Sequence, residues 1–174
     1  VLVTPNNPTA LSVDRPAVLE LARRLAEHRC RLIVDESFVE FSRAGRSASV
    51  EGDIDSHPNL VIIKSMSKVF GIAGLRIGYL LTADRHFAAA VRAHLPIWNL
   101  NGIAESFLRR VGRYRSEFAA SCELVRDTCQ EFYGALSESP GLAPFRPDAN
   151  FVFCKITAPD LTGPALARRL YVRH

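Results

Sequence analysis

Apolar and polar positions along the chain follow two repeating patterns. Short, mostly apolar runs of the kind found in buried strands occupy residues 1–4, 32–35 and 60–64, and residues 76–81 predict a further strand. Apolar residues at three- and four-residue spacing predict a helix over about 14–28, and Asp84 caps a second helix that runs to about 93. Residues 45–57 are polar and predict a loop. Strands that alternate with helices predict an α/β domain.

One long helical pattern dominates the second half of the chain, from residue 114 to 139. Its apolar residues are Phe118, Cys122, Val125, Cys129, Phe132 and Leu136. Their alternating spacings of four and three place all six on one stripe, which we interpret as core rather than as a binding surface. Pro140 and Gly141 end this helix, residues 148–153 predict a strand, and a last helix begins near Pro164.

The chain of 174 residues carries a net charge of +4, which raises the question of a nucleic-acid partner. Its basic cluster consists of Arg109, Arg110, Arg113 and Arg115. No aromatic residues alternate with these arginines in an RNA-binding pattern. A solvated basic face, or attraction to an anionic substrate, explains the charge, and we expect no nucleic-acid partner.

The four cysteines are Cys30, Cys122, Cys129 and Cys154, and they show neither paired metal-ligand spacing nor the framework of a secreted protein. We therefore expect no metal site, and reduced, mostly buried thiols in a cytoplasmic protein. No apolar run is long enough to cross a bilayer, so we expect no membrane partner. The chain begins inside a predicted strand and stops inside a predicted helix, which indicates a central fragment of a longer protein.

The richest candidate chemistry follows the strand at 60–64, where Ser65-Met66-Ser67-Lys68 precedes Gly71, Gly74, Arg76 and Gly78. The hydroxyls of Ser65 and Ser67 and the guanidinium of Arg76 can hold a phosphate. A lysine amine can form a Schiff base where its surroundings favour the free amine, and the charge of Arg76 contributes to this. Taken alone, the segment is equally compatible with an ordinary surface loop.

Two further segments place polar groups at the ends of predicted strands. Asn7 lies in the turn Pro5-Asn6-Asn7-Pro8, which by itself also fits an Asx-type turn before the helix capped by Ser12 or Asp14. Asp35 ends the strand at 32–35, and ligands collect at the carboxyl ends of parallel strands. A carboxylate there is costly unless a cation meets it.

Together, the three segments resemble the cofactor motifs of fold type I pyridoxal-phosphate enzymes, specifically the class I/II aminotransferases. The resemblance implies a large domain with a mixed, mostly parallel sheet flanked by helices, in which the strand at 76–81 is antiparallel, and the start of a smaller α+β domain. It implies a large domain over 1–112, an interdomain helix over 113–139 and a partial small domain over 140–174.

The resemblance also implies roles for individual residues around pyridoxal 5'-phosphate. Lys68 would hold the cofactor through a Schiff base and move the substrate α-proton. Asp35 would pair with the ring nitrogen, which keeps the ring an electron sink, while Glu36 would be structural. Asn7 would contact the ring oxygen, and the phosphate would be bound by Ser65, Ser67 and Arg76.

Some positions depart from the family pattern or bear on the substrate. By resemblance, Phe38 would contact the cofactor, but it stands where tyrosine is common, so a hydroxyl beside the ring oxygen is missing. Ala10 stands where glycine is usual. By resemblance, Asn101 and Asn150 would face the substrate. Trp98 is a possible pocket wall, although core packing is an equal alternative.

The expected function is amino transfer from an amino acid or amino-phosphate donor to a 2-oxo acid, in a homodimer. Within the family, Phe38 and the Pro-x-Trp-x-x-Asn loop place the chain closest to the histidinol-phosphate aminotransferase and threonine-phosphate decarboxylase branch. Alternatives are a decarboxylase of the threonine-phosphate type and a non-catalytic domain fused to a nucleotidyltransferase. This chain alone is not expected to be active, because the family's stacking aromatic and its carboxylate-binding arginine fall outside it.

Overall fold

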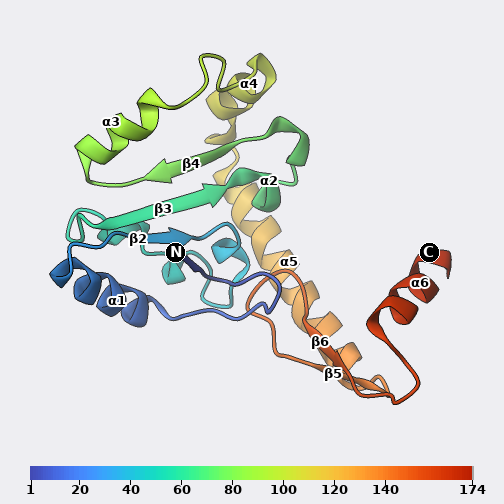
Figure 1. The fold of residues 1–174 in the computed structure, drawn as a ribbon. Coiled ribbons are helices and arrows are strands. Elements are labelled where there is room, and N and C mark those ends of the chain that lie inside the picture. Colours follow the sequence, from blue (N-terminus) through green and yellow to red (C-terminus); the bar gives the residue numbers. More distant parts are fainter. Residues whose placement is uncertain (174) are drawn as a thin grey trace.

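A four-stranded sheet organises the first half of the molecule in the computed structural model, which describes residues 1–173. Its strands, in the order in which they pair, are β1 (Leu2–Val3), β2 (Leu32–Asp35), β3 (Leu60–Ser65) and β4 (Gly78–Leu81). The first three run parallel and β4 runs antiparallel to β3 (Figure 1). The prediction of a mixed, mostly parallel sheet is confirmed.

The register of the strands brings the carboxyl ends of β1, β2 and β3 and the start of β4 to the same side of the sheet. Val3 pairs with Asp35, Asp35 pairs with Ile63, and Ser65 pairs with Gly78. A Cβ atom on Gly78 would lie 2.9 Å from the Lys64 carbonyl oxygen. Glycine is therefore needed where β4 approaches β3 beside Ser65.

Two helices of the sheet domain begin at the aspartates expected from the sequence. Helix α1 (Arg15–Glu27) is capped by Asp14, whose carboxylate accepts the Ala17 N–H at 2.9 Å. Asp14 is thus the cap, and the alternative of Ser12 is wrong. Helix α3 (Arg85–Ala93) is capped by Asp84 in the same way.

The core of the sheet domain lies where α1 packs on the sheet. It is formed by Val18, Ala22, Leu32, Val34, Val50, Leu60 and Ile62. Six of these residues come from the apolar positions of α1 and from the apolar runs of β2 and β3. Val50 lies in the connection between β2 and β3, directly before η3 (Glu51–Asp53). The sequence pattern therefore predicted the part of the core that α1, β2 and β3 form, but not Val50, which lies in the loop expected at 45–57 and is 1% exposed.

Short helices fill the connections within the sheet domain. The 3-10 helices are η1 (Val39–Phe41), η2 (Gly45–Ala48), η3 (Glu51–Asp53) and η4 (Ala73–Leu75), and α2 (Met66–Val69) is a single α-helical turn. Two of the 3-10 helices lie within the expected loop at 45–57. Lys68 therefore belongs to a helical turn rather than to an open loop.

Beyond the sheet, α4 (Gly102–Val111) leads into the long helix α5 (Arg115–Ser137), which runs from the sheet domain to a second, two-stranded sheet (Figure 1). That sheet pairs β5 (Leu142–Pro144) antiparallel with β6 (Cys154–Ile156). Helix α6 (Gly163–Arg173) follows and lies apart from the four-stranded sheet. The last predicted helix is confirmed.

Two details of the second half differ from the prediction. The strand expected over 148–153 is wrong, because these residues are irregular and the strand begins at Cys154. The Asp148 N–H donates to the Ala10 carbonyl oxygen at 2.7 Å instead of joining a ladder. On α5, Cys122 and Cys129 are buried as expected, but Phe132 is 55% exposed and does not belong to the core.

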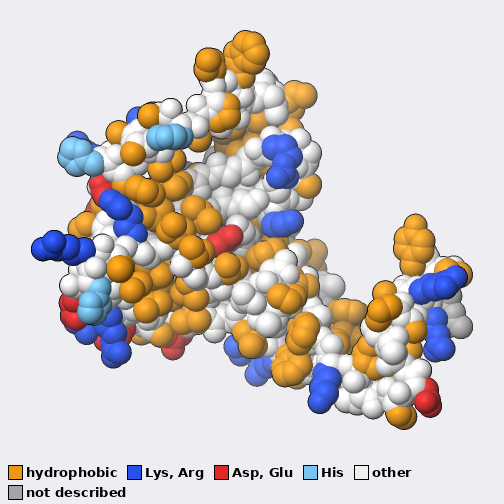
Figure 2. Space-filling model, in the orientation of Figure 1, with side chains coloured by type: hydrophobic (Ala, Val, Ile, Leu, Met, Phe, Trp, Pro, Cys, Tyr) orange, Lys and Arg blue, Asp and Glu red, His pale blue; other side chains and the backbone are white. Residues whose placement is uncertain are grey.

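The surface carries exposed apolar side chains on the segment between α3 and α4, at the top of the view in Figure 2. Ile97 is 97% and Trp98 is 92% exposed, so the alternative that Trp98 packs as core is wrong. All four cysteines are free thiols. Within residues 1–173, no cluster of His, Cys, Asp and Glu side chains could hold a metal ion, and no helix has the length and apolar character to span a bilayer.

Candidate functional site

Four of the predicted site residues line one hollow at the edge where the strands end. Asp35 from the end of β2, Ser65 and Ser67 at the turn from β3 into α2, and Arg76 before β4 surround a cavity of 340 Å³. Residues far apart in sequence meet here because β2, β3 and β4 are neighbours in the sheet. The alignment of strand ends predicted this convergence.

Asp35 is held by one of its two carboxylate oxygens. The Ser37 N–H and the Ser37 hydroxyl both donate to Asp35 Oδ1, at 2.9 and 2.6 Å. The Ser37 oxygen in turn accepts the Ser65 N–H at 2.9 Å. Among the described residues, no group donates to Asp35 Oδ2, so this oxygen is available on the side of the cavity.

The serines and Arg76 are fixed by local backbone structure. Ser65 caps α2, where its hydroxyl accepts the Ser67 N–H at 3.3 Å. Arg76 adopts a left-handed backbone with a φ of 55°, which is uncommon for a residue with a side chain. Its guanidinium donates to the Ala73 carbonyl oxygen at 3.1 Å and keeps its other N–H groups free.

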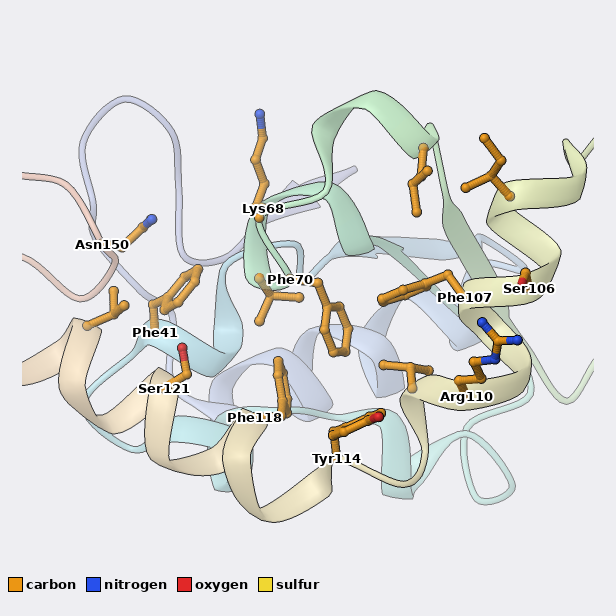
Figure 3. Close-up of a pocket in the computed structure, with 16 residues that line it drawn as sticks. Phe41, Lys68, Phe70, Ser106, Phe107, Arg110, Tyr114, Phe118, Ser121 and Asn150 are labelled. Atoms are coloured by element: carbon orange, nitrogen blue, oxygen red, sulfur yellow. The ribbon is translucent and has the colours of Figure 1, made fainter.

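Lys68 extends from α2 into open space. Figure 3 shows its ammonium group pointing away from the aromatic rings of Phe70 and Phe118, which stack with centroids 4.4 Å apart. Lys68 borders a second, largely aromatic cavity of 790 Å³, which Asn150 also lines. Lys68 is exposed, and within residues 1–173 its amine forms no ion pair or hydrogen bond.

Asn7 lies in the turn after β1, next to the strand of Asp35. The Thr4 N–H donates to the Asp35 carbonyl oxygen at 3.0 Å, which fixes the start of the turn. The side chain of Asn6 accepts the Thr9 hydroxyl at 2.9 Å, whereas the exposed Asn7 side chain has no partner among the described residues. Asn7 rather than Asn6 is therefore free for a ligand.

Ala10 adopts the backbone conformation that glycine would favour at this position of the family pattern. Its φ is 58°, and its side chain is fully buried. The Ala10 N–H donates to the Asn6 carbonyl oxygen at 2.7 Å. The substitution of alanine for glycine therefore leaves the turn closed.

The remaining predicted residues lie in other surroundings. The ring of Phe38 is buried and packs edge-to-face on Phe151 at 5.3 Å. Asn101 caps α4 by accepting the Ala104 N–H at 2.9 Å. Neither Asn101 nor Trp98 lines the two cavities described above. Their contact with a substrate stays a prediction.

Sequence reasoning missed a buried ion network beside the site, of which Lys64 and Tyr79 also line the 340 Å³ cavity. The Lys64 ammonium lies 3.5 Å from Glu36, 3.0 Å from Glu40 and 2.9 Å from Glu51, and its side chain is 3% exposed. Tyr79 donates a hydrogen bond to Glu51. A lysine inside the apolar run of β3 was the available signal, because a buried lysine requires carboxylate partners.

The network determines the charge of its members. Burial opposes the charge of Lys64, but the carboxylates of Glu40 and Glu51 raise its pKa above the ordinary value. Burial raises the pKa of Glu36, although hydrogen bonds from Ser49 and Val50 oppose this shift. Burial acts against the charge of Glu51 too, yet hydrogen bonds from Tyr79 and Lys64 lower its pKa. The Lys64 ammonium is therefore charged and paired with carboxylates inside the protein, whereas the Lys68 amine is exposed.

The fold and this arrangement define an α/β protein with a polar small-molecule site at its strand ends. The donor set fits a phosphorylated pyridine aldehyde: a carboxylate oxygen open for a ring N–H, two hydroxyls and a guanidinium for a phosphate, and an exposed amine for the aldehyde.

The sequence as a whole matches one family. The family model "Aminotransferase class I and II" matches residues 1–174, and the chain belongs to this family of pyridoxal-phosphate-dependent enzymes. The chain is 42% identical, over 99% of its length, to the CMP-5'-(3-aminopropyl)phosphonate synthase of Streptomyces rubellomurinus, of which it covers 27%. It is 33% identical, over 90% of its length, to the L-serine phosphate decarboxylase of Sulfurospirillum multivorans, of which it covers 41%.

A solved structure shows the same fold. The histidinol-phosphate aminotransferase from Clostridium acetobutylicum superposes with a TM-score of 0.90 at 27% identity, over 99% of this chain and 52% of that one. The fold is therefore that of the fold type I aminotransferases. The chain spans between about a quarter and a half of the lengths of these relatives.

Proposed function

We propose that this chain is the cofactor-binding part of a pyridoxal-phosphate-dependent aminotransferase whose amino donor is an amino acid or an amino phosphate. The observation that carries the proposal is the cavity of 340 Å³ that Asp35, Ser65, Ser67 and Arg76 share. Lys68 follows Ser67 directly on α2. A carboxylate, phosphate ligands and an exposed amine are thus gathered at one strand edge.

Each residue has a role that its surroundings support. Asp35 Oδ2 would accept the ring N–H, while the hydroxyls of Ser65 and Ser67 and the guanidinium of Arg76 would bind the phosphate. Asn7 would donate to the ring oxygen. When bound, the cofactor supplies an electron sink for the carbon that loses a substituent.

Lys68 would attach the cofactor through its amine and carry a proton to and from the substrate α-carbon. The chain contains three lysines, of which Lys64 is held by three carboxylates and Lys155 lies on β6. Lys68 alone combines an exposed amine with a position beside the phosphate ligands.

The names of the relatives support a substrate with a phosphorus-containing anionic group. The printed names are those of a phosphonate synthase, a serine phosphate decarboxylase and a histidinol-phosphate aminotransferase. Arg110 lines the cavity that Lys68 borders. A guanidinium there is suited to such an anion, which favours an amino-phosphate or amino-phosphonate donor over a simple amino acid.

Decarboxylation is the second candidate, because the serine phosphate decarboxylase is 33% identical over 90% of this chain. Incubation with a phosphorylated amino acid and a 2-oxo acid separates the two activities. Amino transfer to the oxo acid supports the aminotransferase. Release of carbon dioxide without amino transfer supports the decarboxylase. Cofactor binding without turnover of any amino donor supports a non-catalytic domain.

The test of the site uses the protein that carries this chain, titrated with pyridoxal phosphate. We expect the absorption band of lysine-bound cofactor in the wild type and in a Lys155→Ala control, and its loss in Lys68→Ala. Lys155 is exposed on β6, so its replacement controls for the loss of one lysine charge. An unchanged band in Lys68→Ala would contradict the assignment.

The domain division at 112/113 and 139/140, the homodimer and the cytoplasmic location belong to the same proposal. Helix α5, which joins the sheet domain to the β5–β6 sheet, supports the division. Sedimentation of the protein that carries this chain tests the dimer.

A further inference from the structure

Ser37 links the two halves of the candidate site through a single hydroxyl. Its oxygen accepts the Ser65 N–H at 2.9 Å and donates to Asp35 Oδ1 at 2.6 Å. The direction of both bonds is determined, because an N–H can only donate and an ionised carboxylate can only accept. Ser37 is 8% exposed, so water competes little for these bonds.

The two hydrogen bonds from Ser37 fall on the same oxygen of Asp35. The Ser37 N–H donates to Oδ1 at 2.9 Å, beside the bond from the hydroxyl. A carboxylate held at one oxygen by two donors cannot turn freely about its last bond. Oδ2 is therefore presented in a fixed direction at the cavity that Ser65 and Arg76 also line.

Strand pairing alone does not require the Ser37 hydroxyl. The Glu36 N–H already donates to the Ile63 carbonyl oxygen at 3.0 Å, and Asp35 is paired with Ile63 in the ladder between β2 and β3. The hydroxyl adds a connection from the side chain of Asp35 to the backbone of Ser65, which the ladder does not supply.

We propose that Ser37 is a positioning residue that fixes the Asp35 carboxylate for a ring N–H and holds it in register with the phosphate-binding Ser65. This inference rests on the proposed function, since it takes the cavity to be the cofactor site. Ser37 also lines this cavity, but its hydroxyl is engaged by Asp35 and Ser65, so its proposed role is to orient these two residues rather than to bind the ring or the phosphate. Its effect passes through Asp35 and through the Ser65 backbone.

The test measures cofactor binding and the pH titration of the cofactor band in Ser37→Ala and in Ser37→Thr. In Ser37→Ala the band persists, because Lys68 is intact. We expect the dissociation constant of pyridoxal phosphate to rise about tenfold, as for the loss of one hydrogen bond to a charged group. We also expect a change in the pH titration of the absorption band of lysine-bound cofactor. Its midpoint should rise by about half a pH unit or more, since a loosened Asp35 carboxylate pairs less well with the ring N–H. Ser37→Thr keeps the hydroxyl and restores both values.

Ser42→Ala is the matched control. Ser42 is also a buried serine, and its hydroxyl donates to the Val39 carbonyl oxygen at 2.8 Å, away from Asp35. Ser42→Ala can lower stability but leaves the midpoint unchanged. If circular dichroism shows that Ser37→Ala is unfolded, Ser37→Cys replaces it, because a thiol of similar size is only a weak donor.

The outcomes separate the two proposals. A wild type without any Lys68-dependent band overturns the proposed function, and this inference with it. The second outcome is a normal band in the wild type but no effect of the Ser37 substitution. If Ser37→Ala or Ser37→Cys leaves the pH midpoint of the band unchanged and the affinity for pyridoxal phosphate within twofold of wild type, this inference alone is overturned.

Discussion

At the scale of single residues, Arg29 has an unfavourable backbone conformation at the end of α1. Arg29 follows the helix with a φ of 55°, and its N–H donates to the Ala26 carbonyl oxygen at 2.9 Å. This left-handed position is the one that glycine prefers after a helix, because a Cβ atom is unfavourable there. Arg29 is exposed, so its side chain contributes little packing to offset the strain.

We therefore expect Arg29→Gly to be more stable than Arg29→Ala by about 1 kcal/mol, the cost of a left-handed residue with a Cβ atom. Both variants remove the arginine side chain, so their difference isolates the backbone. Urea denaturation of the protein that carries this chain measures it. Equal stabilities, or a more stable alanine variant, would show that the residue is not held in this conformation.

At the scale of elements, β3 depends on the ion network around Lys64. Replacing Lys64 with methionine keeps the aliphatic stem but leaves Glu36, Glu40 and Glu51 without their shared cation. We expect Lys64→Met to lower the free energy of unfolding by about 3–5 kcal/mol, as for a buried charge that loses its partner. Lys155→Met, at an exposed position, should change it by no more than about 0.5 kcal/mol.

The destabilisation caused by Lys64→Met should depend on pH, because it involves the ionisation of Glu36. Burial raises the pKa of Glu36, and removal of Lys64 raises it further because an opposite charge is lost. A raised folded-state pKa means that stability is regained as the pH falls through that value. The destabilisation in Lys64→Met should therefore be smaller at pH 5 than at pH 7. An equal loss at both values would indicate that the carboxylates do not sense Lys64.

The same elements show what sequence could and could not predict. Asp14 and Asp84 were readable as helix caps, and Asp35 as a strand-end carboxylate, because those signals are local. Tertiary contacts set the remaining features. Phe132 continues the stripe of α5 but is exposed, because no other element within residues 1–173 covers its side chain. Ser37 gave no signal, since its importance depends on the neighbouring strand that carries Ser65.

At the scale of the whole molecule, Asp148 ties the segment after α5 to the first half of the chain. Its carboxylate accepts the Arg43 N–H at 2.8 Å and the Arg43 guanidinium at 3.0 Å. Its own N–H donates to the carbonyl oxygen of Ala10, in the turn that contains Asn7. This contact across 105 residues explains why the strand expected at 148 does not form. It also places the neighbouring Asn150 on the cavity of Lys68.

The Asp148 contact predicts a pH-dependent stability. Burial alone would raise the pKa of the Asp148 carboxyl, but the Ser12 hydroxyl and the hydrogen bonds and charge of Arg43 hold it below its ordinary value. A lowered folded-state pKa contributes stability above the unfolded value of about 3.9, and this stability is lost as the pH falls through the folded value. Asp148→Asn should therefore lower the free energy of unfolding by about 1–3 kcal/mol at pH 7, with a smaller difference from wild type below pH 4. Denaturation at both pH values, with the exposed Asp160→Asn as control, measures the effect. A difference that stays constant between pH 7 and pH 3 would show that the Asp148 charge does not hold the two halves together.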